Sequence, residues 1–166
     1  RVTNGLRFSY PGYNEILSGF PDSRIDSNDR KPNPNVTVLE WLNGRPGFNG
    51  KVATFASWEL LPWIVNTERS HIPANGAGAP ITDPKSDRER AINEFAAEMP
   101  PYWGETRADA PTGFGALEYL KKNKPRALYV MLGETDEWAH GRRYDLYLDA
   151  AWRNDRFIRR LWETAQ

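Results

Sequence analysis

Apolar residues recur at intervals of three and four along several parts of the chain, which is the spacing of one helix face. The longest such stretch covers residues 144–166, where Leu148, Trp152 and Leu161 are among the apolar positions. Ser86 is placed to cap a second stretch and Gly19 to end a third. We therefore expect helices over residues 9–20, 36–43, 58–66, 86–98, 110–123 and 144–166.

Two short apolar runs, residues 51–56 and 126–133, have the length and composition of buried strands. Residues 21–35 and 75–84 are polar or rich in glycine and proline, which predicts loops. Helices that alternate with short buried strands are typical of a mostly parallel sheet covered by helices. The sequence therefore predicts an α/β fold with three α/β/α layers, with residues 1–166 in a single domain.

Composition narrows the class of protein. Lysine and arginine number 22, as do aspartate and glutamate, so the net charge is zero, whereas nucleic-acid-binding proteins usually carry a basic excess. No apolar run approaches the roughly 20 residues of a membrane span. The chain has no cysteine, so any metal must be bound by carboxylate, imidazole or hydroxyl groups. We expect neither a nucleic acid nor a membrane as partner.

The strongest chemical signal is ETDEWAH, residues 134–140, which directly follows the second predicted strand. In open α/β sheets, ligands bind beyond the carboxyl ends of the strands. Asp136 and His140 are four residues apart, so a helical turn places their side chains on one face. A carboxylate and an imidazole that converge in this way suit a zinc ion. The alternative is an aspartate that caps a helix and a histidine at the surface.

A second signal is SYPGYNEILSGF, residues 9–20. Ser9 precedes a helix initiated by a proline, where free N–H groups and the helix dipole favour negative charge. This environment suits a hydroxyl that becomes an alkoxide and attacks phosphorus or sulfur, and a metal ion would lower its pKa further. The alternative is that Ser9 is simply the N-cap residue of the helix.

Several familiar catalytic motifs are missing, namely the GxSxG nucleophile elbow, the P-loop and GxGxxG. The only other histidine, His71, lies in the polar stretch ERSHIP and is expected at the surface. A Ser–His–Asp triad that uses Ser9 with either histidine stays open, although no local pattern supports it. Paired carboxylates across a cleft, as in carbohydrate-active enzymes, also stay open.

Taken together, the two segments resemble the alkaline phosphatase superfamily, which includes nucleotide pyrophosphatases and phosphodiesterases, sulfatases and cofactor-independent phosphoglycerate mutases. Phosphodiesterase-like members carry a threonine or serine, an aromatic residue and a proline, followed after six residues by a hydroxyl residue and glycine. SYPGYNEILSG matches this pattern from Ser9 through Pro11 to Gly19. Those members also carry D-x-x-x-H after a buried strand, here Asp136 and His140. The whole chain is similar to a bacterial subgroup of alkaline phosphatase family proteins.

This resemblance implies a metal-dependent hydrolase of small phosphate or sulfate esters. Ser9 would be the nucleophile, and Asp136 and His140 would bind one of two divalent metals, expected to be zinc. Many relatives are exported, which favours a periplasmic or secreted location.

Asparagines near the nucleophile are candidates for binding the substrate oxyanion. In the mechanism that the resemblance implies, Asn14 and either Asn33 or Asn35 could donate hydrogen bonds to the substrate oxyanion.

Part of the family's two-metal site is missing from the sequence. None of the eight residues before Ser9 is acidic, and no later D-H-G pattern occurs. We therefore expect an incomplete alkaline-phosphatase-like domain, an internal piece whose site is completed by the remaining parts of its own chain, and which alone is a poor enzyme or none. The alternative is a catalytically inactive subdomain or degenerate relative that acts as a binding or structural module.

Overall fold

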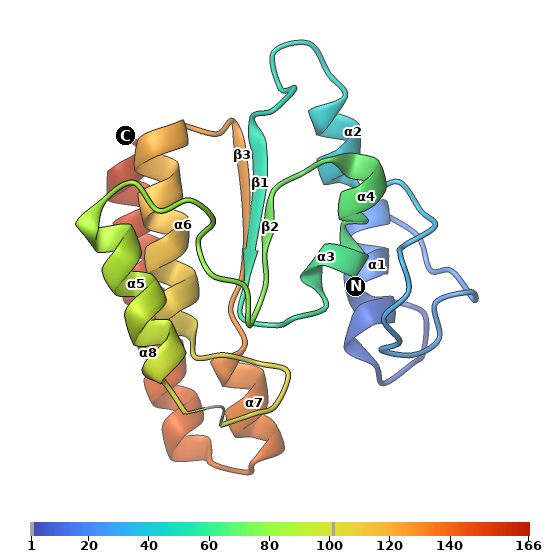
Figure 1. The fold of residues 1–166 in the computed structure, drawn as a ribbon. Helices are drawn as coiled ribbons and strands as arrows, with labels where there is room; N and C mark the ends of the chain where they lie inside the picture. Colours follow the sequence, from blue (N-terminus) through green and yellow to red (C-terminus); the bar gives the residue numbers. More distant parts are fainter. Residues whose placement is uncertain (1, 101) are drawn as a thin grey trace.

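The computed structural model describes residues 2–100 and 102–166 and has three layers (Figure 1). The middle layer is a sheet of three parallel strands in the order β2-β1-β3: β1 (Val52–Ala56), β2 (Ala74–Asn75) and β3 (Ala127–Met131). Helices α1 to α4 cover one face, and α5, α6 and α8 lie on the other. The predicted three-layer α/β fold with a parallel sheet is confirmed.

β1 is the central strand, and it is buried over its whole length. It pairs with β3 from Val52 opposite Ala127 to Ala56 opposite Met131. Strands with helices on both faces are apolar throughout, instead of alternating, which is why residues 51–56 could be recognised. Val52 and Ala56 join the larger apolar core on the α1–α3 side, while Phe55 packs on the α6 side.

The first face is covered by α1 (Ser9–Ser18), α2 (Val38–Asn43), α3 (Leu61–Ile64) and α4 (Thr67–Ser70). Gly19 ends α1 with a φ of 88°, a left-handed conformation that glycine adopts without steric cost. This end was predicted.

The helix predicted over residues 58–66 forms only in part, over Leu61–Ile64. The chain forms α3 and α4 instead, because Pro62 lies in the first turn of α3 and suits a helix start. Asn66 then takes a φ of 45° and caps α4 with its side chain, which interrupts the helix. β2 was also missed, since it has two residues and overlaps the loop predicted for residues 75–84.

The second face carries α5 (Asp87–Glu98), α6 (Asp109–Asn123) and α8 (Tyr144–Ala165), and α7 (Glu134–His140) connects β3 to α8. Ser86 caps α5 as predicted, in a reciprocal capping box with Glu89. α8 packs on α6 where Gly113 leaves room for the Phe157 ring, because a Cβ at Gly113 would lie 3.0 Å from that ring. Within the described ranges, no helix has both the length and the apolar character of a membrane span.

Glu89 stabilises the start of α5 through its negative charge. Its carboxylate accepts hydrogen bonds from the N–H groups of Lys85 and Ser86 and pairs with Lys122 at 3.1 Å. Burial raises the pKa of Glu89, but these hydrogen bonds and the Lys122 charge outweigh it and lower the pKa from 4.5 to about 2.

Because the folded-state pKa of Glu89 lies below its unfolded value, its contribution to stability is present above about pH 4.5 and is lost as the pH falls toward about 2. We expect Glu89→Gln to lower the free energy of unfolding by about 1 kcal/mol near neutral pH and to change little at about pH 2. Urea unfolding at both pH values tests this, with the exposed Glu94→Gln on the same helix as control. A loss that is equal at both pH values would contradict the prediction.

Candidate functional site

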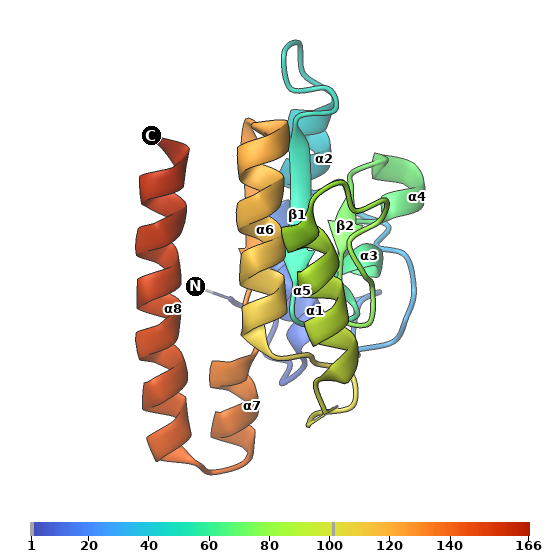
Figure 2. The same ribbon diagram turned by 60° about the vertical axis from the view of Figure 1, so that its left-hand side comes forward.

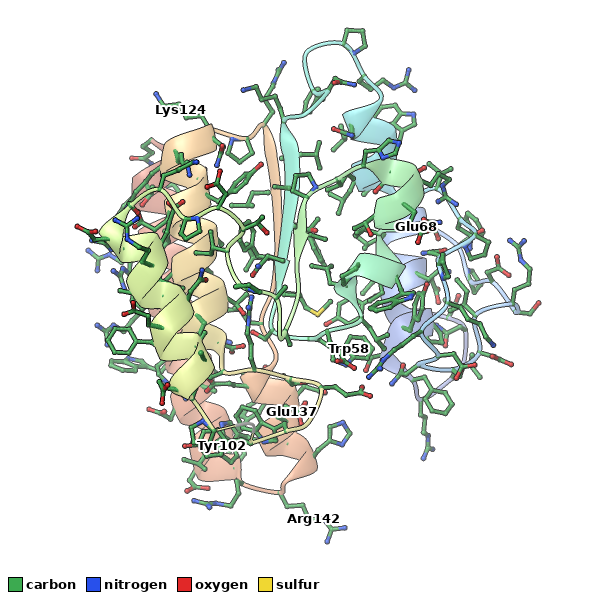
Figure 3. All side chains as sticks on the ribbon, in the orientation of Figure 1. Trp58, Glu68, Tyr102, Lys124, Glu137 and Arg142 are labelled. Atoms are coloured by element: carbon green, nitrogen blue, oxygen red, sulfur yellow. The ribbon has the colours of Figure 1, made fainter. Side chains whose placement is uncertain are left out.

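A pocket of about 410 Å³ opens at the carboxyl ends of β1 and β3. Figure 3 shows Trp58 and Glu137, two of its lining residues, at this end of the sheet. Ser9, Asp136 and His140, which come from opposite ends of the sequence, all line it. The other lining residues are Tyr13, Asn28, Trp58, Trp103, Gly104, Glu105, Thr106, Met131, Leu132, Gly133 and Glu137.

Ser9 is the first residue of α1, and it is exposed. The N-cap residue is Phe8, which provides no side-chain cap. The N–H of Tyr10 instead donates to Oδ1 of Asn28 at 2.9 Å. The interpretation of Ser9 as the N-cap is therefore wrong, and Ser9 lines the pocket at the positive end of the helix dipole.

Asp136 and His140 lie on one face of α7, as their spacing predicted. Nε2 of His140 is 3.6 Å from Oδ2 of Asp136, and the two side chains are 77% and 67% exposed. The residue that caps α7 is Gly133, so Asp136 is not a capping residue. His140 does lie at the surface, as the alternative interpretation expected. At 3.6 Å the pair is too far apart for the hydrogen bond that orients the histidine of a catalytic triad.

The pocket contains some, but not all, of the side-chain ligands that a divalent metal needs. The Asp136 carboxylate and the His140 imidazole lie close together on α7, and Ser9 and Glu137 line the same pocket. Across residues 2–100 and 102–166, no group of three or more His, Cys, Asp or Glu side chains is close enough to hold a metal ion. Because zinc takes about four ligands, Asp136 and His140 fit one side of such a site.

A buried network around Asp109 fixes the position of α7. The Asp109 carboxylate accepts hydrogen bonds from the Ser57 hydroxyl at 2.6 Å and from the N–H groups of Gly133 and Glu134 at 2.7 and 3.2 Å. It thereby joins the end of β1, the start of α6 and the start of α7. Burial raises the pKa of Asp109, the Glu134 charge adds to this, and the three hydrogen bonds oppose it.

Glu134 completes this network. One of its carboxylate oxygens accepts a hydrogen bond from the N–H of Asp109 at 2.8 Å, and the other pairs with Arg153 of α8 at 2.7 Å. Its side chain is 5% exposed. The turn that carries Asp136 and His140 is therefore anchored at its first residue to both α6 and α8.

Aromatic rings form another part of the pocket wall. Trp58 and Trp103 each form a β-bridge with Thr106, which brings the loop after β1 beside residues 103–106. The Trp58 ring lies 6.2 Å from that of Tyr13. Burial raises the pKa of Tyr13, and so does the negative charge of Asp136. The pocket thus combines polar groups with apolar walls.

Asn28 and the two tryptophans were missed as site residues from the sequence. Asn28 caps a helix that lies well before it in the chain, so no local capping pattern reveals it. Trp58 and Trp103 are far apart in sequence and meet through the bridges to Thr106. The abundance of tryptophan was visible, but large rings more often fill apolar cores than line pockets.

The expectation that Asn14, Asn33 and Asn35 contact substrate is replaced by a structural role. All three are buried, and none lines the pocket. Asn35 Nδ2 donates to Oδ1 of Asn14 at 3.1 Å, and Asn33 Nδ2 donates to the carbonyl of Ile64 at 3.0 Å. Buried amides must satisfy their hydrogen bonds within the protein, and these three tie α1 to the loop that precedes α2 and to α3.

His71 is exposed, as predicted. It ends α4 with a φ of 53° and lies outside the pocket lining. Of the two histidines, His140 is therefore the one that shares a pocket with Ser9.

Comparison of the chain with protein-family models, with curated proteins and with solved structures found no match. The chemistry of the pocket is therefore interpreted from its own residues. It combines a hydroxyl at a helix N-terminus with a carboxylate–imidazole pair at the end of a parallel strand.

Proposed function

We propose that the protein carries part of the active site of a metal-dependent phosphoric or sulfuric ester hydrolase of the alkaline phosphatase superfamily. One observation carries the proposal: Ser9, Asp136 and His140, each selected from the sequence alone, line a single pocket. The pocket also lies where α/β sheets bind ligands, beyond the carboxyl ends of the strands.

Ser9 acts as the nucleophile in the proposed reaction. Its hydroxyl loses a proton, and Oγ attacks the phosphorus or sulfur of the ester in line with the leaving oxygen, which departs with the bonding electrons. Water then hydrolyses the phospho- or sulfo-serine and regenerates the hydroxyl. The N-terminus of α1 favours the negative charge that develops at Oγ. A divalent metal, when bound, lowers the pKa of the hydroxyl and neutralises charge on the ester oxygens.

Asp136 and His140 would hold that metal from one side, and we propose that other parts of the same polypeptide supply the remaining ligands. Two protein ligands give a weak site, because zinc normally takes four. The residues described here are accordingly a poor catalyst by themselves, and a small phosphate or sulfate ester is the substrate of the completed site.

Zinc binding tests the ligand proposal directly. On the polypeptide that includes the remaining metal ligands, we expect the double variant Asp136→Ala/His140→Ala to lose about one equivalent of bound zinc, because both residues are proposed ligands of the same ion. The matched control is Glu68→Ala/His71→Ala, which removes an acid and a histidine outside the pocket. Zinc is measured by elemental analysis after equilibrium dialysis, and equal zinc in the site variant and the wild type would exclude the ligand roles.

A binding or structural module without catalysis is the second candidate. It is favoured because α7 offers two converging ligand side chains rather than a full set. The exposed apolar residues of α8, which include Trp152, Ile158 and Trp162, also favour it. A panel of aryl phosphate, phosphodiester and aryl sulfate, assayed with zinc, separates the two candidates. Turnover that depends on Ser9 supports the hydrolase, whereas zinc binding without turnover by the complete protein supports the module.

A further inference from the structure

The sequence contains four Asn-Gly pairs, a dipeptide in which the asparagine can lose its side-chain amide without an enzyme. The pairs begin at Asn4, Asn43, Asn49 and Asn75. Because glycine has no side chain, its backbone nitrogen is sterically open to the side-chain carbonyl carbon of the preceding asparagine. The same dipeptide occurs in all four places, so the surroundings of each pair in the fold decide which of them reacts.

The reaction is an attack of the main chain on the side chain. The glycine nitrogen gives up its proton and bonds to the asparagine Cγ, and the side-chain amide nitrogen leaves as ammonia. Water then breaks one of the two C–N bonds of the resulting cyclic imide and yields aspartate or isoaspartate. Ring closure requires the nitrogen and Cγ to reach the geometry of attack, so it needs a side chain that is free to rotate.

Asn43 is held on both sides of the reacting bond. Its Nδ2 donates to the carbonyl of Ser70 at 3.1 Å, and its Oδ1 accepts a hydrogen bond from the N–H of Gly50 at 3.1 Å. The attacking nitrogen would be that of Gly44, which donates to the carbonyl of Glu40 at 3.1 Å at the end of α2. Ring closure would have to break all three hydrogen bonds.

Asn75 and Asn4 are held in a similar way. Asn75 Nδ2 donates to the carbonyl of Ala79 at 3.0 Å, and its Oδ1 accepts a hydrogen bond from Arg107 at 2.6 Å. The glycine that follows it is crowded, because a Cβ there would lie 3.2 Å from a backbone carbonyl oxygen. Asn4 Nδ2 donates to the Glu15 carboxylate at 3.0 Å, and its Oδ1 accepts from a backbone N–H at 2.8 Å. Both side chains are therefore fixed by hydrogen bonds.

Asn49 has different surroundings. It is exposed in the turn between α2 and β1, and its side chain makes no hydrogen bond within the part of the chain that the structure describes. The space beside Gly50 is open, since a Cβ there would meet no atom within 4 Å. One contact restrains the pair, the hydrogen bond from the Gly50 N–H to Asn43 Oδ1 at the surface. The Asn49 side chain itself is free to rotate.

We propose that Asn49 is a site of spontaneous deamidation, and that the fold protects the other three Asn-Gly pairs. Figure 2 shows the turn that carries Asn49 projecting at the end of the sheet opposite α7. The pocket lined by Asp136 and His140 lies at the α7 end. This inference is therefore independent of the proposed hydrolase activity.

The modification changes the turn that leads into the central strand. Isoaspartate adds a carbon atom to the main chain at residue 49, and aspartate adds a negative charge there. Lys51, two residues later, accepts hydrogen bonds at its carbonyl from the N–H groups of Arg126 and Ala127 at 2.8 and 3.1 Å. These bonds join the start of β1 to the start of β3, so the altered turn adjoins the first contact of this strand pair.

Peptide mapping by mass spectrometry, after incubation of the folded chain at mildly alkaline pH, tests the proposal. We expect the peptide that contains residue 49 to gain the mass of an asparagine-to-aspartate change, and to separate into two isomers on chromatography. Its rate should exceed that of the other three pairs by at least about 10-fold, because their side chains are held away from the geometry of attack. The rate should rise with pH, since the attacking nitrogen must lose its proton. In urea the four pairs should react at similar rates.

Asn49→Gln is the matched control, because the longer side chain would have to close a larger ring and does so far more slowly. Its peptide should keep its mass, and the other three pairs should behave as in the wild type. Circular dichroism checks that the wild type and the variant are folded during the incubation. Another Asn-Gly pair that reacts as fast as Asn49 in the folded chain would overturn the proposal. So would an Asn49 peptide that keeps its mass while the chain in urea is modified.

Discussion

Ser9→Ala is expected to lower ester hydrolysis by at least about 1,000-fold, because it removes the atom that attacks the substrate. The fold should be unaffected, since Ser9 is exposed and the Asn28 side chain, rather than that of Ser9, caps the N-terminus of α1. Turnover of an aryl phosphate, a phosphodiester and an aryl sulfate is measured with zinc, on the polypeptide that includes the remaining metal ligands. The free energy of unfolding, from urea titration, should match that of the wild type.

Ser18→Ala is the matched control for this prediction. Ser18 ends the same helix, lies outside the pocket, and donates its hydroxyl to the carbonyl of Asn14 at 2.8 Å. Its removal should leave turnover unchanged. Rapid acid quenching followed by peptide mass spectrometry should find the phospho- or sulfo-group on Ser9. Full turnover by Ser9→Ala, or a covalent group on another residue, would refute the nucleophile role.

The features that were predictable from the sequence are those encoded over a few residues. The burial of β1 followed from a short apolar run, and the end of α1 from Gly19. Asp136 and His140 were expected on one face because residues four apart share a face of any helix. Their pocket was expected beyond the end of a strand because ligands of open α/β sheets bind beyond the carboxyl ends of the strands.

What escaped prediction depends on contacts between distant residues. Asn28 caps α1 through a single hydrogen bond across the loop. β2 exists only because β1 lies beside it, with Thr54 opposite Ala74. Asn14 and Asn33 were mistaken for substrate ligands because a buried structural amide and a substrate-binding amide are the same group, and only the surrounding structure distinguishes them.

The Asp109 network also escaped prediction, although it decides where the site residues lie. Asp109 looks in the sequence like an ordinary acid at a helix start. In the fold its carboxylate is buried and joins Ser57, Gly133 and Glu134, which come from two strand ends and from α7. The position of Asp136 and His140 on α7 therefore rests on a residue that does not line their pocket.

Asp109→Ala is accordingly expected to lower the free energy of unfolding by about 4 kcal/mol, because it leaves the N–H groups of Gly133 and Glu134 without an acceptor and leaves the Ser57 hydroxyl only the Thr112 hydroxyl as a partner. Asp109→Asn keeps one acceptor oxygen and should lose about half as much. The control is Asp87→Ala, which removes an exposed acid from the first turn of α5 and should cost no more than about 0.5 kcal/mol. Urea unfolding measures all three variants. If Asp109→Ala proved as stable as Asp87→Ala, the network would not anchor α7, and the geometry of Asp136 and His140 would have to be set by the contact between α7 and α8 alone.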